Sequence, residues 1–105
     1  MLPCSVSNML IRLREKTESG DMAWEFDEME SAVQAELPKF GIQLRYNYSL
    51  TEHVPEFRIV FTRKLTGKDY HFWTDERCGD YQVVRRLYDC ALASELAADL
   101  DLDLD

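Results

Sequence analysis

The chain has 105 residues, a formal net charge of −8 and a hydrophobic fraction of 46%. This length suits one compact domain, and the interspersed apolar residues exclude wholesale disorder. The excess of carboxylates argues against direct binding to nucleic acid or to a membrane surface, because both attract lysine and arginine. Residues 1–8 lack the pattern of a secretory signal, and no stretch is long enough to span a bilayer. We therefore expect a cytoplasmic protein.

The first predicted element is a helix that begins after Pro3. The hydroxyls of Ser5 and Ser7 are expected to accept hydrogen bonds from the amides of its first turn. Gly20 is predicted to end the helix. Positions three and four residues apart form one mostly apolar stripe, which we expect to pack on a sheet: Val6, Met9, Leu10, Leu13 and Thr17.

An acidic block occupies residues 18–36, which contain no lysine or arginine. Its local structure has two alternatives. Asp27 could cap a short helix that extends to Leu37, or the alternation that includes Val33 and Ala35 could form a strand. The pattern favours the short strand. The carboxylates of this block include Glu25, Asp27, Glu28 and Glu30.

Three strands are predicted in the middle of the chain, because apolar and polar residues alternate there with a period of two. They cover residues 42–50, 57–62 and 70–74. The connections between them are shorter than a parallel crossover requires, so we expect antiparallel neighbours.

The last predicted element is a helix that begins near Asp80, whose carboxylate is expected to cap it. Its apolar face also contains Glu95, and a buried unpaired charge is costly. We therefore expect the packed part of the helix to end near Glu95. Residues 99–105 alternate aspartate and leucine, form a second acidic block, and are predicted to be a disordered tail.

Together these elements predict a single α+β domain over residues 1–98. We expect an antiparallel meander of three or four strands, with the N-terminal and C-terminal helices packed on one face. The order is α-β-β-β(-β)-α. The other face of the sheet is expected to stay open.

The three cysteines, Cys4, Cys78 and Cys90, are scattered and odd in number, which predicts reduced thiols rather than disulfides. Cys90 is expected to pack inside. Together with His53 and His71 they show none of the close paired spacings of zinc sites, so we predict no metal and no cofactor.

A catalytic role would fall to Cys78, because it precedes the last helix, whose amides could lower the pKa of a thiol. No glycine-rich phosphate loop and no oxyanion motif accompanies it. We therefore predict a protein that is not an enzyme and has no catalytic residue. A small enzyme or metal protein that uses Cys78 stays as an alternative.

A candidate binding surface lies on the open side of the predicted sheet. The strand parity that buries Ile59 projects four other side chains outward together: Arg45, Arg58, His71 and Trp73. Tryptophan and arginine are enriched in binding hot spots. The alternative interpretation is that the segment around Trp24 covers Trp73 and that the arginines pair with the acidic block.

The acidic blocks suggest a second contribution to binding. Ordered carboxylates can imitate a line of phosphates and occupy a basic channel on another protein. The alternative is that such a charge run is only a solvated face.

Residues 13–20, which end in Lys-Thr-Glu-Ser-Gly, are followed by Trp24, and the last helix contains Leu87-Tyr88 with Ala91. In these features the chain loosely resembles small uncharacterised bacterial and phage proteins. The resemblance implies no catalytic residues. Its size, acidity and layout are also similar to phage-encoded inhibitors of CRISPR and other defence systems, which is a fold-level analogy.

The leading functional hypothesis is a non-catalytic accessory or regulatory protein, such as an acidic inhibitor from a phage or mobile element. It would bind a protein partner with a basic surface through the acidic block and the open strand face. The alternative from another class is a structural homodimer that forms through the open sheet face around Trp73.

Overall fold

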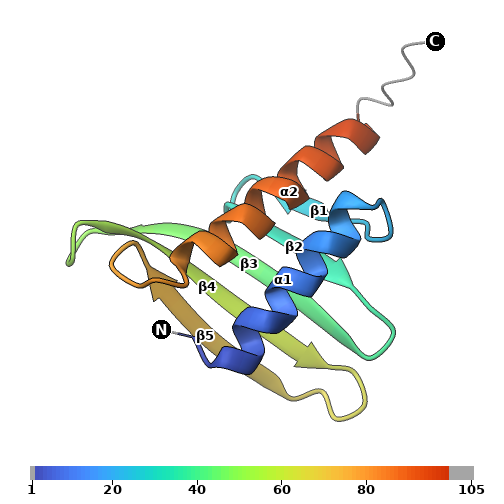
Figure 1. Cartoon of the computed structure of the whole chain (residues 1–105), viewed down its shortest axis with the longest axis horizontal. Coiled ribbons are helices and arrows are strands. Elements are labelled where there is room, and N and C mark those ends of the chain that lie inside the picture. Colours follow the sequence, from blue (N-terminus) through green and yellow to red (C-terminus); the bar gives the residue numbers. More distant parts are fainter. Residues whose placement is uncertain (1, 100–105) are drawn as a thin grey trace.

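The computed structural model describes residues 2–99 as two helices and five strands (Figure 1). In chain order these are α1 (Cys4–Glu18), β1 (Glu25–Asp27), β2 (Ala32–Glu36), β3 (Phe40–Ser49), β4 (Val54–Arg63), β5 (Asp69–Asp75) and α2 (Tyr81–Asp99). The predicted acidic tail, residues 99–105, lies outside the described residues apart from Asp99.

The strands form one antiparallel sheet in the order β1-β2-β3-β4-β5. The predicted α+β class and the flanking helices are confirmed. The sheet has five strands rather than three or four, because residues 18–36 contribute two short strands instead of one. The helix considered for residues 27–37 does not form, since Val33 and Ala35 pair with Leu44 and Ile42 and extend the apolar face of the sheet.

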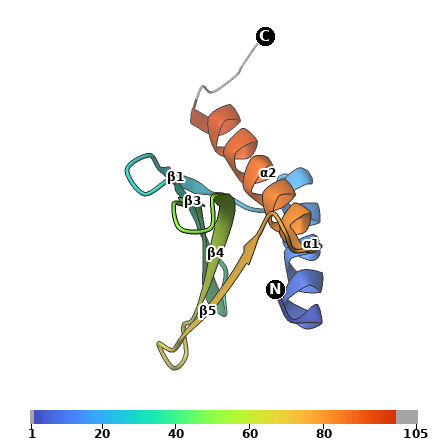
Figure 2. The same ribbon diagram turned by 90° about the vertical axis from the view of Figure 1, so that its left-hand side faces the viewer.

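Both helices cover the same face of the sheet (Figure 2). The two helices run in the same direction. Near their starts, the Leu2 amide donates a hydrogen bond to Asp80, and further along both helices Glu18 of α1 lies beside Cys90 of α2. The apolar residues of the sheet are buried under them, as period-two alternation requires. The largest fully buried side chains are Phe57, Leu10, Ile42, Leu44, Ile59, Leu87, Val33, Val84 and Thr74.

The boundaries of α1 correct one prediction and confirm another. Ser5 and Ser7 lie inside the helix and do not cap it. Pro3 is the N-cap, and its carbonyl accepts hydrogen bonds from the amides of Val6 and Ser7. At the other end, Gly20 adopts a φ of 84°, a conformation that only glycine reaches without a steric penalty. Its amide donates to the Thr17 carbonyl and completes the C-terminal cap.

The start of α2 also differs from the prediction. The Asp80 carboxylate does not cap the helix, because it accepts hydrogen bonds from the Leu2 amide and the Thr74 hydroxyl instead. It therefore joins the N-terminal segment and the start of α2 to β5. Further along, Glu95 is only half-buried and Leu96 is 55% exposed, so the packed part of α2 ends where the position of Glu95 predicts.

A buried polar contact fixes the chain after α1. The Thr17 hydroxyl donates to the Leu13 carbonyl at 2.7 Å and accepts the Trp24 indole N–H at 3.0 Å. Both side chains are at least 95% buried. A buried polar group without a partner is costly, so this contact holds Trp24 in the core and sets the path from α1 to β1.

We predict that Thr17→Val lowers the free energy of unfolding by about 1–3 kcal/mol, because it leaves the indole N–H buried without an acceptor. In a Trp24→Phe background the same substitution should cost at least about 0.5 kcal/mol less. Urea denaturation of the four proteins measures this cycle. Additive effects would show that the two side chains are not coupled.

Candidate functional site

No helix covers the face of the sheet opposite α1 and α2 within residues 2–99 (Figure 2). Most of its side chains are exposed or half-exposed, although neighbouring side chains bury Ala32 and Asp75. Its strand register gathers six of the eight predicted site residues into two adjacent rows. One row runs Asp27, Ala32, Arg45, Arg58, Trp73 across the five strands. The next runs Glu25, Gln34, Gln43, Val60, His71. We call this surface the uncovered face.

Trp73 stands at one end of the first row on the edge strand β5, directly across from Arg58. It is 52% exposed, which is high for so large an apolar side chain. The alternative that the segment around Trp24 covers it is wrong, because Trp24 is buried in the core on the helix side of the sheet. The predicted exposed aromatic group is therefore present.

The two arginines of the row lie opposite each other on β3 and β4. Like charges in directly opposed positions destabilise a sheet, so each needs a compensating group. Arg45 has one, since Glu30 lies 3.3 Å away. The carboxylate nearest to Arg58 is that of Glu56 at 3.9 Å, and the Arg58 side chain is 65% exposed. Pairing with the acidic block thus accounts for Arg45 and not for Arg58.

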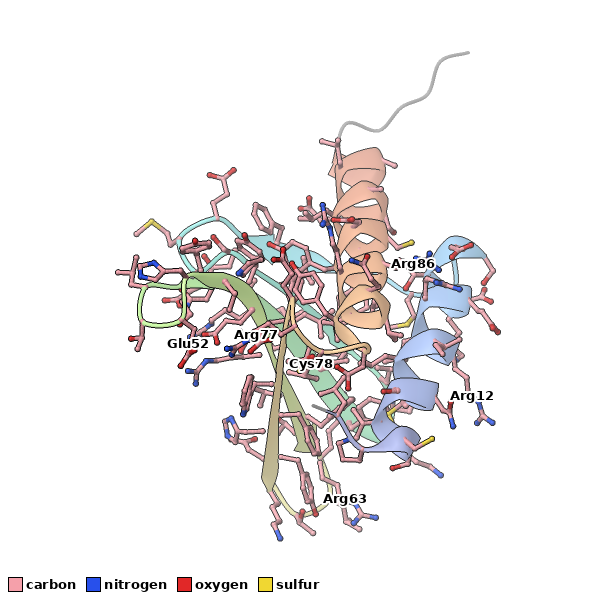
Figure 3. All side chains as sticks on the ribbon, turned by 60° about the vertical axis from the view of Figure 1, so that its left-hand side comes forward. Arg12, Glu52, Arg63, Arg77, Cys78 and Arg86 are labelled. Carbon is pink, nitrogen blue, oxygen red and sulfur yellow. The ribbon has the colours of Figure 1, made fainter. Side chains whose placement is uncertain are left out.

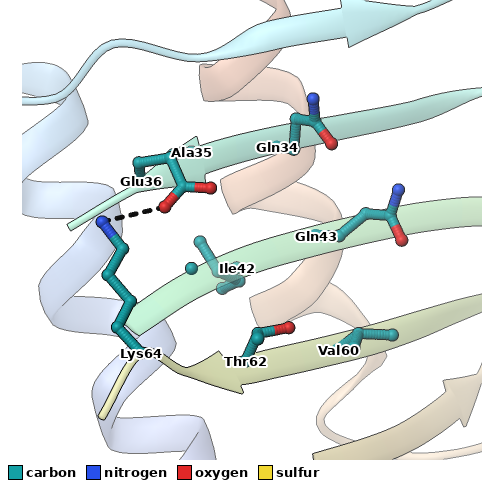
Figure 4. A pocket seen from close by; sticks show the side chains of 9 residues that line it. Gln34, Ala35, Glu36, Ile42, Gln43, Val60, Thr62 and Lys64 are labelled. Carbon is teal, nitrogen blue, oxygen red and sulfur yellow. Dashed lines mark ion pairs between the residues drawn. The ribbon is translucent and has the colours of Figure 1, made fainter. Parts of the chain in front are cut away.

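The uncovered face is shallow and polar rather than a deep apolar pocket. A depression of about 490 Å³ is lined by both rows, including Arg45, Arg58, His71 and Trp73. A neighbouring one of about 320 Å³ is lined by side chains that include Gln34, Gln43 and Val60, and Lys64 pairs with Glu36 at its edge at 2.9 Å (Figure 4). Small-molecule sites are mostly apolar and enclosed. This surface resembles a wet protein interface more closely.

The acidic block borders the uncovered face at β1 and the turn that follows. Asp27 shapes this turn, because its Oδ1 accepts the amides of Met29 at 3.0 Å and Glu30 at 3.3 Å. Glu25 accepts a hydrogen bond from the Gln34 amide at 3.4 Å. Within residues 2–99, only Glu30 of the four predicted carboxylates forms an ion pair. Glu25, Asp27 and Glu28 are exposed and carry net negative charge.

Two exposed apolar residues at this end of the sheet were not among the predicted site residues. Met29, in the turn between β1 and β2, is 95% exposed, and Leu50, in the turn between β3 and β4, is 82% exposed. Alternate turns of an antiparallel meander lie at the same end of the sheet, and Met29 lies within the acidic block. Leu50 lies further out, because β3 extends four residues beyond Arg45, its last partner on β2. The only sequence signal for Met29 is its position between the carboxylates of Glu28 and Glu30.

The loop between β5 and α2 holds Cys78 beside a charged cluster (Figure 3). Arg77 binds the two Asp75 oxygens, at 3.2 Å from Nε and 2.7 Å from Nη2, and its Nη1 donates to Glu52 at 3.0 Å. Asp75 is almost fully buried by these contacts. Hydrogen bonds from the Arg77 side chain hold the pKa of Asp75 below its usual range, against the opposing effect of burial. The cluster therefore fixes the loop.

Cys78 has a lowered pKa, chiefly because the backbone of Asp75 hydrogen-bonds to the sulfur. The sulfur also lies 3.9 Å from the Asp75 carboxylate, a poor neighbour for a thiolate. In contrast, burial raises the pKa of Cys90, which is half-buried rather than fully packed inside. Among the described residues, no three histidine, cysteine or acidic side chains cluster as metal ligands would.

Comparison of the chain with protein-family models, with curated proteins and with solved structures finds no match. None of the helices in residues 2–99 combines the length and the apolar character needed to cross a bilayer.

We predict that Asp75→Asn destabilises the protein at neutral pH and that this difference disappears in acid. A lowered folded-state pKa adds stability above the unfolded value of about 3.9, and this stability is lost as the pH falls through the folded-state value. Denaturation at pH 7 and at successively lower pH measures the difference. Glu76→Gln, a neutralisation at the exposed neighbouring position, is the control. An equal loss at all pH values would contradict the account.

Proposed function

We propose that this chain is a non-catalytic protein-binding module that blocks or modulates a partner with a basic surface. The setting that we propose is the cytoplasm, where it acts as a small accessory inhibitor such as phages and other mobile elements encode. The observation that carries the proposal is the cross-strand row on the uncovered face, which joins an exposed tryptophan and an exposed arginine to an acidic border.

The dimensions of the row support binding of a folded partner. Adjacent strands lie about 4.8 Å apart, so the row from Asp27 to Trp73 spans about 19 Å. An ordinary interface buries about 800 Å² on each partner, which a patch of this width can supply. Trp73 and Arg58 lie side by side at one end, and both residue types dominate hot spots.

The charge distribution supports a basic partner. Glu25, Asp27 and Glu28 form no ion pair within residues 2–99 and are exposed, so their field extends outward from the edge of the sheet. Such a border accelerates and orients the approach of a basic surface. Met29, at the tip of the same turn, adds an apolar contact.

The polar character of the uncovered face favours reversible binding of a different protein over formation of a structural homodimer. Obligate dimer interfaces are more apolar than ordinary surfaces. Here Val60 and Trp73 are the main apolar side chains among amides, arginines and hydroxyls. An open-face homodimer therefore has less support.

The proposal predicts that Trp73→Ala raises the dissociation constant for the partner by about thirtyfold, as loss of a hot spot of about 2 kcal/mol would. Glu25→Lys with Glu28→Lys should raise it by at least about tenfold and reduce its dependence on salt. The partner is first captured from a lysate of the source organism, identified, and purified. Binding is then titrated at several salt concentrations.

The matched control is Glu15→Lys with Asp89→Lys. This pair changes the net charge by the same amount, but its two positions lie on α1 and α2 instead of at the acidic border. Circular dichroism verifies that each variant folds. Binding that is insensitive to salt, or equally weakened by the control pair, would overturn the proposal.

A further inference from the structure

An aromatic groove opens where the helices leave one corner of the sheet uncovered. Its volume is about 350 Å³, and it lies on the helix side of the sheet, away from the uncovered face. The floor consists of aromatic rings in edge contact. The centroid of the Phe61 ring lies 5.7 Å from that of Phe40 and 6.2 Å from that of Phe72. The groove is lined by Val6, Met9, Lys39, Phe40, Phe61, Arg63, Tyr70 and Phe72.

The rim of the aromatic groove is basic, in contrast to the chain as a whole. Lys39 and Arg63 line it, and within residues 2–99 neither forms an ion pair. The Lys64 amide donates to the Lys39 carbonyl at 3.1 Å, which joins the β2–β3 and β4–β5 turns at this end. Lys68 adds a third cation, 5.1 Å from the Tyr70 ring centre. An apolar floor under a cationic rim fits a ligand that combines apolar side chains with carboxylates.

The chain itself contains a segment with this chemistry. Residues 99–105 read Asp-Leu-Asp-Leu-Asp-Leu-Asp. In an extended chain, alternate side chains point to opposite sides. All three leucines can then face an apolar floor while the aspartates point toward a rim.

The segment of the same copy is too short to reach the groove. The helices run in parallel with Glu18 beside Cys90, and α2 continues to Asp99 on the side away from the groove (Figure 1). Met9 lies nine residues before Glu18, and Asp99 lies nine residues after Cys90. At 1.5 Å per residue the separation along the helices is about 27 Å. Residues 100–105 span at most about 20 Å. The segment that binds must therefore come from another copy.

We propose that residues 99–105 of one copy bind in the aromatic groove of a second copy. The leucines lie on the ring floor, and the aspartates lie beside Lys39 and Arg63. Because each copy carries one groove and one segment, the association either closes into a reciprocal dimer or continues head to tail. This contact is independent of the uncovered face and of the proposed function.

A labelled peptide of residues 97–105 tests the proposal by fluorescence anisotropy. The receptor carries Leu100→Asn, Leu102→Asn and Leu104→Asn, so that its own segment does not compete. We expect saturable binding, weakened at least about tenfold by Lys39→Glu with Arg63→Glu. Met9→Glu, at a lining position that is 39% exposed, should also weaken it. Unmodified protein should show a concentration-dependent mass in sedimentation, and the triple leucine variant should not.

The charge control is Lys16→Glu with Arg86→Glu, which gives the same net charge; Figure 3 shows Arg86 on α2, well away from Arg63. The sequence control is a peptide of the same composition with its leucines grouped together. Absence of peptide binding, equal binding of the grouped peptide, or equal weakening by the control pair would each overturn the proposal. Loss of binding in Trp73→Ala would also contradict it, because Trp73 lies on the other side of the sheet.

Discussion

One-sided burial of the sheet is the constraint on which the rest of the molecule depends. The side chains that alternate along β3 and β4 place Ile42, Leu44, Phe57 and Ile59 under the two helices. The same alternation fixes the opposite residues on the other side, because a shift of one residue would exchange the faces. The position of every candidate binding residue on the sheet is therefore set by the core rather than by local preference.

Polar contacts at the ends of the elements complete this arrangement. Thr17 anchors Trp24 after α1, and Asp80 joins the start of the chain to β5. The hydrogen bond between Thr17 and Trp24 also accounts for the Lys-Thr-Glu-Ser-Gly sequence and the tryptophan that follows it. Gly20 caps the helix and Thr17 holds Trp24 in the core, so these residues need no catalytic role to explain them. Residues 16–24 therefore have a structural role. Our functional proposal rests instead on the uncovered face and its acidic border.

Much of the fold could be predicted from the sequence, because strands β3 to β5 and both helices have strong periodic patterns. The outward projection of Arg58 and Trp73 follows from the same patterns. Strand β1 could not be predicted, since three residues with one apolar side chain give no periodic signal. The role of Asp80 was missed because its partners, Leu2 and Thr74, come from elsewhere in the chain. The aromatic groove was missed for a related reason, since it depends on where the helices stop covering the sheet.

One face of the sheet lies open to solvent around Trp73, while the helices cover most of the other face. Acrylamide quenching of the two single-tryptophan proteins, Trp24→Phe and Trp73→Phe, measures this most directly. We expect Trp73 to be strongly quenched, with emission typical of an indole in water, and Trp24 to be protected. A protected Trp73 with blue-shifted emission in the monomer would show that the face is covered, and it would contradict the account.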